Sequence, residues 1–260
     1  MYVFDNAAPQ AASRLAVLAQ VFDPGTTRHL AARGIGPGWA CLEVGGGLGT
    51  ITRWLSDRVG SEGRVLATDI DTRHLKEVRR SNVEIREHDI RADALPQAAF
   101  DLAYARLVLE HLPDPDAALA RMIGALKPGG WLLVEDFEVL PGAPGAARPD
   151  TDCISKTAAA IRHVTAAAGV NQRLGRSLGR RLRHHGLADV ETEGRVFAWH
   201  GGSSGTALAR LNAEQLRTEI LASGTLTADE LEADLAALDD PEFEMRSPIL
   251  WTAWGQRRPR

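Results

Sequence analysis

The sequence contains few of the residues from which disulfide frameworks and metal centres are built. Only two of its 260 residues are cysteines, and they stand far apart at Cys41 and Cys153. Two cysteines at this separation give neither a disulfide framework nor the close spacing of metal ligands. We therefore interpret both as buried thiols and expect no metal site.

The sequence also lacks basic clusters and long apolar runs. Its 30 Lys and Arg residues are scattered among 34 Asp and Glu residues, and the formal net charge is −4, so the electrostatic footprint of a nucleic-acid-binding protein is missing. No apolar stretch approaches the roughly 20 residues that cross a bilayer. The opening MYVFDNAAPQ has no basic segment followed by an apolar one, as a secretion signal would. We expect a cytoplasmic protein, a monomer or homodimer, that acts on a small molecule and binds neither nucleic acid nor membrane.

What the sequence does contain is a regular alternation of short apolar runs and helical segments. A chain of 260 residues with 44% hydrophobic residues can bury the core of one α/β domain. Helix-like spacing at Thr50–Val59 and Asp116–Leu126 separates runs with strand character, which predicts a doubly wound α/β fold with a parallel sheet. The expected strands are Ala40–Val44, Arg64–Asp69, Val83–Glu87, Phe100–Ala105 and, after a turn at Lys127–Gly130, Trp131–Asp136.

The segments outside this core are predicted to be mainly helical. Residues 1–38 are expected to form a helical arm or lid, and residues 39–260 a main domain with substrate-side insertions at about 141–185 and 197–240. In the second insertion, Thr227 and Glu230 have the spacing of a capping box. The other expected elements are helices at Ala11–Phe22, Thr27–Arg33, Ile154–Ala168 and Leu174–His184, a Pro/Gly-rich loop at Val139–Asp150, and strands at Ala188–Val196 and Ile249–Trp254.

The most informative stretch is CLEVGGGLGT, Cys41–Thr50, which has four glycines in five positions between an expected strand and an expected helix. Such a turn lets the backbone approach a ligand and directs the helix N-terminus toward it. The pattern is E-x-GxGxG, and therefore differs from the GxGxxG of dinucleotide cradles. Glu43 would also repel phosphates, whereas a ligand with a cationic centre and an amino group would meet no such repulsion.

From this turn onward the sequence resembles the class I S-adenosylmethionine-dependent methyltransferases, in particular the small-molecule branch of ubiquinone/menaquinone-biosynthesis and actinobacterial natural-product enzymes. The likeness covers about Trp39–Phe137 in consecutive motifs: LEVGGGLG, ATDID, REHDI, FDLAYARLVLEHL and LKPGGWLLVED. It implies a Rossmann-like sheet of seven strands with helical insertions after the fifth and sixth. It also implies S-adenosyl-L-methionine as cofactor and methyl transfer to an O, N or C atom of a small-molecule acceptor, expected to be a secondary metabolite with an aromatic ring.

The same motifs imply a set of cofactor-binding residues. Asp69, at the end of the second strand, would bind the two ribose hydroxyls, since a carboxylate can accept two hydrogen bonds from a cis-diol. Arg106, after the fourth strand, would reach the methionine part of the cofactor, and an ordinary surface arginine is the alternative. The other residues that the resemblance assigns to the cofactor are Glu43, Gly45, Gly47 and Gly49 at the first turn, Ile70 beside Asp69, and Asp89 and Ile90 at the adenine ring.

Catalysis is assigned to His111 and Asp136. Methyl transfer requires alignment of the acceptor and, for a hydroxyl or ammonium acceptor, removal of a proton. His111 follows the fourth strand at the expected mouth of the site, where its imidazole would be a base; a structural histidine is the alternative. Glu110 beside it is interpreted as a solvated or helix-capping acid. Glu135 and Asp136 end the fifth strand, at the edge where open α/β sheets bind ligands, so one of them would face the acceptor.

Residues outside the core are expected to select the acceptor. Aromatic faces suit a cationic sulfonium and a flat acceptor alike, and for each side chain simple packing is the alternative. The candidates are Tyr2, Phe4 and Arg14 in the arm, His163 in the helix after the fifth strand, and Phe197 and Trp199 before the second insertion.

Two other functions stay open. A cyclase or isomerase on the same fold would bind the cofactor without giving up its methyl group. A nicotinamide-dependent reductase is disfavoured because the sequence has neither GxGxxG nor a Tyr-x-x-x-Lys pair. A reductase would bind NADH and a methyltransferase would not, so cofactor binding separates these two.

Overall fold

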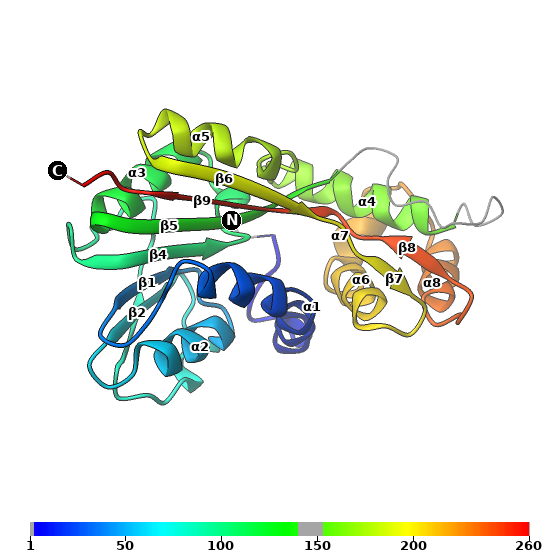
Figure 1. Cartoon of the computed structure of the whole chain (residues 1–260). Coiled ribbons are helices and arrows are strands. Elements are labelled where there is room, and N and C mark those ends of the chain that lie inside the picture. Colours follow the sequence, from blue (N-terminus) through cyan, green and yellow to red (C-terminus); the bar gives the residue numbers. More distant parts are fainter. Residues whose placement is uncertain (1–2, 140–152, 260) are drawn as a thin grey trace.

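The computed structural model describes residues 3–139 and 153–259 of the chain (Figure 1). Its helices are α1 (Ala11–Ala31), α2 (Thr50–Val59), α3 (Pro115–Ala125), α4 (Cys153–Ala167), α5 (Leu178–His184), α6 (Ser204–Gln215), α7 (Arg217–Ala222) and α8 (Ala228–Ala237). Its strands are β1 (Ala40–Val44), β2 (Arg64–Asp69), β3 (Val83–Glu87), β4 (Phe100–Arg106), β5 (Leu126–Glu138), β6 (Ala188–Arg195), β7 (Ala198–His200), β8 (Glu244–Arg246) and β9 (Ile249–Gln256). Short 3₁₀ helices lie at η1 (Leu75–Glu77), η2 (Leu109–His111) and η3 (Gly175–Ser177).

Seven strands form one twisted sheet in the order β3-β2-β1-β4-β5-β9-β6. The strands from β3 to β5 are parallel, whereas β9 pairs antiparallel with both β5 and β6. The predicted doubly wound, seven-stranded α/β fold is thus confirmed, and the predicted bounds of β1, β2, β3 and α2 agree with the structure. The carboxyl ends of β1 and β4 meet where the strand order reverses, which is the usual ligand site of open α/β sheets.

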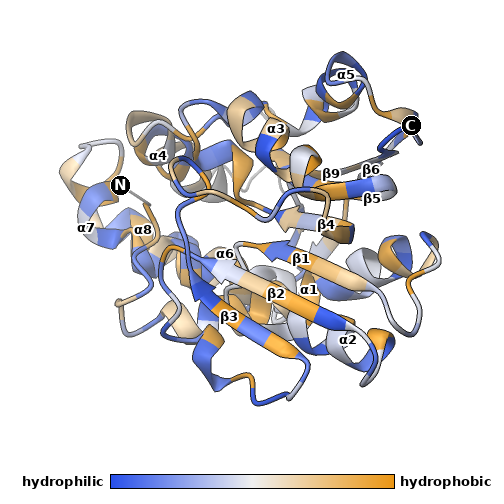
Figure 2. Ribbon diagram, turned by 90° about the vertical axis from the view of Figure 1, so that its left-hand side faces the viewer, coloured by the Kyte–Doolittle hydropathy of each residue, from blue (hydrophilic) through white to orange (hydrophobic). Residues whose placement is uncertain are grey.

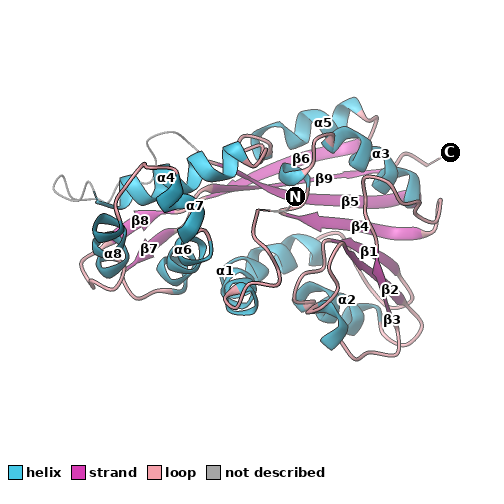
Figure 3. Cartoon of the chain, turned by 180° about the vertical axis from the view of Figure 1, so that it is seen from behind, coloured by secondary structure: helices cyan, strands magenta, loops and turns pink. Residues whose placement is uncertain are grey.

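Helices cover both faces of the sheet, as parallel strands require. On one face α3 and α5 pack on the core through residues such as Leu119 and Leu182, which meet Leu42 of β1. On the other face α2 and the end of α1 pack through Leu55 and Leu30. Figures 1 and 3 show these two layers on opposite sides of the strands, and Figure 2 shows hydrophobic colouring along the central strands. All five residues of β1 are buried, and the thiol of Cys41 is free.

A second lobe stands beyond the carboxyl ends of the strands. It comprises the two-stranded sheet β7-β8 and the helices α4, α6, α7 and α8, as Figure 3 shows. Its own hydrophobic core includes Trp199, Leu208 and Leu235, and continues into Phe22 of α1. The predicted capping box is confirmed, because Thr227 and Glu230 exchange side chain to backbone hydrogen bonds at the start of α8.

The N-terminal arm differs from the prediction in having one continuous helix where two were expected. Helix α1 runs through Pro24, although a proline inside a helix removes a hydrogen bond. Contacts with the sheet stabilise the helical turn around Pro24, because the Arg106 guanidinium binds Asp23 and Thr26 on either side of this proline. Because Gly25 has no side chain, Arg195 can cross the helix at that position, where a Cβ would lie 1.3 Å from its Nη1.

The turn predicted at Lys127–Gly130 lies instead inside the irregular start of β5. The pairing of β4 with β5 shifts between Phe100 and Leu102, and Gly129 takes a φ of +81° there. The predicted loop at Val139–Asp150 lies outside the described residues after Val139, as does Tyr2, and the side chain of Cys153 is not described. Within the described ranges, no helix combines the length and apolar character needed to cross a membrane.

Candidate functional site

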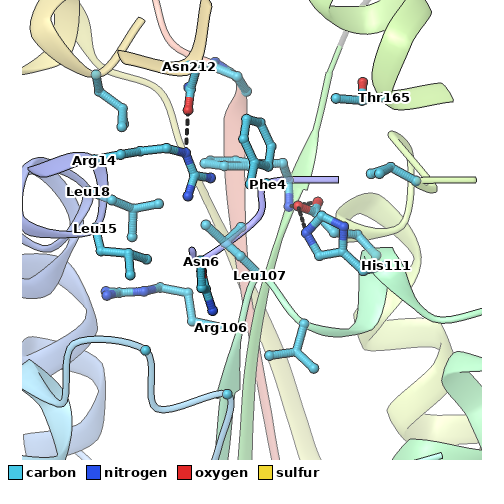
Figure 4. A pocket seen from close by; sticks show the side chains of 18 of the residues that line it. Phe4, Asn6, Arg14, Leu15, Leu18, Arg106, Leu107, His111, Thr165 and Asn212 are labelled. Carbon is cyan, nitrogen blue, oxygen red and sulfur yellow. Dashed lines mark hydrogen bonds and ion pairs between the residues drawn. The ribbon is translucent and has the colours of Figure 1, made fainter. Parts of the chain in front are cut away.

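A cavity of about 830 Å³ lies between the carboxyl ends of the strands and the second lobe (Figure 4). On the strand side it is lined by the glycine turn after β1, by Asp69 and Ile70 at the end of β2, by residues 88–91 after β3, and by residues 106–108 and 110–113 at the end of β4 and beyond. On the other side it is lined by α1, α4, α6 and α8. One continuous space therefore joins a polar half at the sheet edge to an apolar half formed by the additional helices.

The glycine turn combines left-handed backbone with close packing. Gly45, Gly47 and Gly49 have φ values of +77°, +53° and +72°, which side chains rarely adopt. Gly45 and Gly47 line the cavity, as predicted, but Gly49 does not. A Cβ on Gly49 would lie 2.3 Å from Val78 Cγ2, so this glycine lets the start of α2 pack against the η1 segment. The expectation that Gly49 lies under the ligand stays a prediction, and the structure gives this glycine a packing role.

Asp69 borders the cavity at the end of β2. Its Oδ2 accepts a hydrogen bond from the Gly47 amide at 2.9 Å, and its Oδ1 accepts one from the Asp71 amide at 3.1 Å. Burial raises the pKa of this carboxyl, although these amides lower it. Each oxygen keeps a second acceptor position, so the carboxylate links β2 to the glycine turn and can still receive hydroxyl groups.

The predicted adenine-binding residues line the cavity next to Asp69. Ile90 is buried, whereas Ile70 is 52% exposed although it is a large apolar side chain. Asp89 forms two-pronged hydrogen bonds with the Arg91 guanidinium, which hold the pKa of Asp89 below its ordinary value. His88, which sequence reasoning missed, lines the same wall. It is buried, and neither of its ring nitrogens has a hydrogen-bond partner among the described residues.

Glu43 lies buried at the base of the cavity. Its Oε2 accepts a hydrogen bond from the Thr52 hydroxyl. Burial raises the pKa of Glu43 to about 8, although Thr52 and Arg106 oppose this shift. At neutral pH the carboxyl is therefore mainly protonated in the ligand-free protein, and a cation placed beside it would favour its ionised form.

Arg106 lines the cavity but is not the surface arginine considered as the alternative. Its side chain is only 10% exposed and forms an ion pair with Asp23 at 2.7 Å. Its Nη1 donates to the Thr26 hydroxyl at 2.9 Å. These two contacts join α1 to the end of β4. Moving α1 away would leave the Arg106 charge without its partner, which is unfavourable.

Glu135 lies fully buried behind Arg106 and does not line the cavity. It accepts hydrogen bonds from Tyr104 at 3.2 Å and from Thr26, Arg195 and Thr252 at 2.6 Å. These four donors come from α1, β4, β6 and β9, and they occupy the positions at which a carboxylate accepts hydrogen bonds. Glu135 therefore ties elements together and does not face an acceptor.

Glu110 and Asp136 form a buried acidic pair below His111. Asp136 Oδ1 accepts a hydrogen bond from the Glu110 amide at 3.3 Å, and Asp136 Oδ2 has no partner within the described part of the chain. Burial raises the pKa of both carboxyls, that of Glu110 to about 7, and the proximity of Glu110 raises that of Asp136 further. Glu110 is therefore not the solvated acid that was expected. Asp136 is 1% exposed and absent from the cavity lining, so the structure does not place it against an acceptor.

His111 lines the cavity opposite α1, as Figure 4 shows. Its Nε2 lies 3.5 Å from Glu110 Oε1. Burial, together with the positive charge of Arg14, lowers the pKa of His111 to about 4. The imidazole is therefore neutral at pH 7, and it is a weak base.

Phe4, Arg14 and Trp199 line the apolar half, as predicted. His163 and Phe197 do not line it, so the structure gives no support to these two predictions. His163 lies on the exposed face of α4, whose inner face presents Ile161 and Thr165 instead. Phe197 packs edge to face on Phe22, with ring centroids 5.7 Å apart. Among the described side chains, no group of three or more His, Cys, Asp or Glu residues has the arrangement of a metal site.

Part of the chain is similar to known proteins. Residues 42–134 match a family model described as "Methyltransferase domain". A ubiquinone/menaquinone biosynthesis C-methyltransferase of Vibrio vulnificus is 36% identical over 112 residues, which are 40% of this chain and 43% of that protein. The chain thus spans less than half the length of this curated relative in the match.

Solved structures of known proteins share the whole fold. A putative methyltransferase from Bacillus halodurans has a TM-score of 0.58 at 14% identity and covers 89% of this chain and 98% of its own. The cyclase SpnF has a TM-score of 0.50 at 18% identity and covers 90% and 80%. At such identities the likeness shows the fold alone, and the fold is shared by proteins of different activity.

Proposed function

We propose that this chain, whose residues 42–134 are a methyltransferase domain within a class I fold, transfers a methyl group from S-adenosylmethionine to a small molecule. The observation that carries the proposal is the continuous cavity, in which the glycine turn and Asp69 border the same space as the apolar half. A methyl donor at the sheet edge and an acceptor between the helices would share one enclosure. That enclosure would hold the reacting atoms together and exclude water.

Several features of the polar half fit S-adenosylmethionine. Asp69 keeps acceptor positions for two ribose hydroxyls, and the exposed apolar side chain of Ile70 would be covered by a flat ring. His88 has two unpartnered ring nitrogens at the same wall and suits the polar edge of a base. Glu43, neutral in the ligand-free protein, can ionise beside a cationic group. A phosphate-bearing cofactor would lack this last complementarity.

We assign the following residues to the cofactor. Asp69 would hold the ribose; Ile70, Ile90, His88 and Asp89 would hold the adenine; Gly45 and Gly47 would admit the ligand to the backbone; and Glu43 would face the amino-acid end. Arg106 would act mainly through α1, which it anchors beside this end. When bound, S-adenosylmethionine supplies an electrophilic methyl group on a cationic sulfur.

The chemistry of the acceptor follows from His111 and its neighbours. With a pKa of about 4, neutral His111 can take a proton only from an acidic or activated group. It would not remove the proton of an alkylammonium, whose pKa is about 10. We therefore assign the acceptor atom to an electron-rich carbon or an acidic oxygen, on a molecule with an aromatic ring that packs against Phe4 and Trp199. Asp136 would position the η2 turn, and hence His111, through the Glu110 amide.

Titration calorimetry of the chain with S-adenosylmethionine and S-adenosylhomocysteine, with NADH as the control, tests the cofactor assignment. We expect binding of both sulfur ligands and none of NADH. Binding of NADH alone would favour a reductase. Acceptor candidates are then incubated with methyl-labelled cofactor, and the products are identified by mass. Label in the product supports methyl transfer, whereas rearranged product without label would show a cyclase or isomerase instead.

A further inference from the structure

We propose that Arg14 forms an anion-binding subsite in the apolar half of the cavity, and that the acceptor is an apolar molecule whose carboxylate pairs with this guanidinium. That the bound molecule is a methyl acceptor depends on the proposed function. The anion-binding subsite itself depends only on the geometry around Arg14. A planar guanidinium and a carboxylate form two parallel hydrogen bonds, which orient a ligand as well as bind it.

Arg14 is built into the cavity wall and held in one orientation. Its side chain is only 5% exposed although it is charged. Its Nε donates to Asn212 Oδ1 at 2.7 Å, and the face of its guanidinium stacks on the Phe4 ring, 3.8 Å from the centroid. These contacts use one edge and one face of the group. In Figure 4 the two Nη nitrogens point toward the space between Leu18 and Phe4.

No acidic side chain of the described residues neutralises Arg14. The only hydrogen bond from Arg14 within that part of the chain goes to an amide oxygen, and no carboxylate there lies within 4 Å of its nitrogens. The positive charge of Arg14 lowers the pKa of Glu110 slightly against the effect of burial, but Glu110 Oε2 accepts a hydrogen bond from the Phe137 amide at 3.2 Å. Glu110 is on the far wall with His111. A buried cation without an ion partner is costly, and a ligand carboxylate would remove that cost.

The other charged groups around the cavity are already paired or less buried. Arg91 is bound to Asp89 and Arg106 to Asp23. Arg162 of α4 lines the same cavity but is only half-buried. Arg14 is thus the cation best enclosed and best placed for an anion.

The surroundings of Arg14 indicate the rest of the ligand. Leu15 and Leu18 come from its own helix, and Ile161, Leu208 and Met245 line the wall formed by the second lobe. Such a lining favours a hydrocarbon or aromatic body, with the charged end directed at Arg14. A polar or multiply charged molecule would leave this apolar surface uncompensated.

The test uses matched carboxylates and amides as probes. Benzoate, phenylacetate and 3-phenylpropanoate, each with its neutral amide, are titrated into the full chain with and without S-adenosylhomocysteine. We expect at least one carboxylate to bind at least tenfold tighter than its amide. Arg14→Gln should weaken that binding by roughly 10- to 100-fold, the range for a lost charge-assisted hydrogen-bond pair. Arg14→Lys should weaken carboxylate binding less than Arg14→Gln, because lysine keeps the charge but lacks the two parallel N–H donors of the guanidinium.

Arg162→Gln is the matched control, since it removes a cation from the same cavity and should leave carboxylate binding unchanged. Equal binding of acids and amides by the wild type overturns the proposal, as does carboxylate binding that survives Arg14→Gln or is lost in Arg162→Gln. Circular dichroism and S-adenosylhomocysteine binding show whether each variant is folded. If carboxylates bind through Arg14 but S-adenosylhomocysteine does not bind at all, the anion subsite stands and the methyl-transfer proposal fails.

Discussion

Binding of the cofactor should release a proton from Glu43, so its affinity should rise with pH. In the ligand-free protein, burial raises the pKa of Glu43 to about 8, from an ordinary value of 4.5. The ammonium group of S-adenosylhomocysteine, placed beside this carboxyl, stabilises its charged form and returns the pKa toward the ordinary value. The free protein then holds a proton that the complex lacks. By linkage the complex is favoured as pH rises, until pH exceeds the pKa of the free protein.

The size of the effect follows from the distance between the pH and that pKa. Each pH unit below about 8 should weaken binding by about tenfold, because Glu43 must first be deprotonated. Binding at pH 7 should therefore be about 10 times weaker than its limit at high pH, and at pH 6 about 100 times weaker. The same shift makes ligand-free protein less stable as pH rises from 4.5 to 8, since the folded state favours the protonated form.

Titration calorimetry with S-adenosylhomocysteine at pH 6, 7, 8 and 9 measures the slope of log affinity against pH. The difference in binding enthalpy between two buffers of different ionisation enthalpy gives the number of protons released. Glu43→Gln keeps the shape of the side chain and an acceptor for Thr52, and it should reduce this slope. The ammonium of the ligand titrates equally with both proteins, so the difference in slope belongs to Glu43. Glu62→Gln, at an exposed position, is the control. Equal affinity of the wild type at pH 6 and pH 8, or an unchanged slope in Glu43→Gln, would refute the reasoning.

Three further predictions concern other residues of the site. Asp69→Ala should weaken S-adenosylhomocysteine binding by about 1.5–3 kcal/mol, the range for hydrogen bonds to a charged group; calorimetry that finds wild-type affinity would remove Asp69 from the ribose site. His111→Gln should lower turnover and leave cofactor affinity unchanged, and wild-type turnover should fall only as pH approaches the His111 pKa of about 4; a pH profile identical in the variant would show that His111 is not the base. Arg106→Met should lower the free energy of unfolding by about 1.5–3 kcal/mol, the range for lost hydrogen bonds to a charged group, since it leaves the half-buried Asp23 unpaired. In urea denaturation, adding Asp23→Leu should restore part of this loss, and a double variant no more stable than Arg106→Met would argue against the pair.

The sheet and the cofactor side of the cavity could be predicted from the sequence because their signals are local. A strand buried on both faces has a short apolar sequence, and the ends of this apolar run predict the ends of the strand. Residues that follow parallel strands meet at one edge, so Asp69 and the glycine turn could be placed together before the structure was known. His88 follows β3 in the same way, and the rule that selected Asp69 could have selected it. The family motif at this position selects Asp89 instead.

Several side-chain environments could not be predicted because they depend on contacts between distant parts of the chain. Arg14 and Asn212 are 198 positions apart, and nothing local to either predicts their hydrogen bond. The packing of α4 in the second lobe determines which side of this helix is buried. The exposure of His163 could therefore not be predicted from the sequence of the helix alone. Glu110 resembles a surface acid in sequence, yet it is buried because the end of β5 passes over it and its Oε2 binds the Phe137 amide.

Helix α1 shows why the two halves of the cavity cannot be treated as independent. At one end Asp23 and Thr26 are fixed by Arg106 of β4. Nine residues earlier, about 13 Å along the axis at about 1.5 Å per residue, the same helix presents Arg14 to the acceptor side. Between them Leu15 lies 3.8 Å from the position of a Cβ on Gly47, in the cofactor turn. A helix held at one end by the Arg106–Asp23 ion pair therefore helps to set the position of the acceptor subsite relative to the methyl donor. The continuity of α1 through Pro24 keeps Asp23 and Thr26 in one helix, so that the Arg106 guanidinium can bind both.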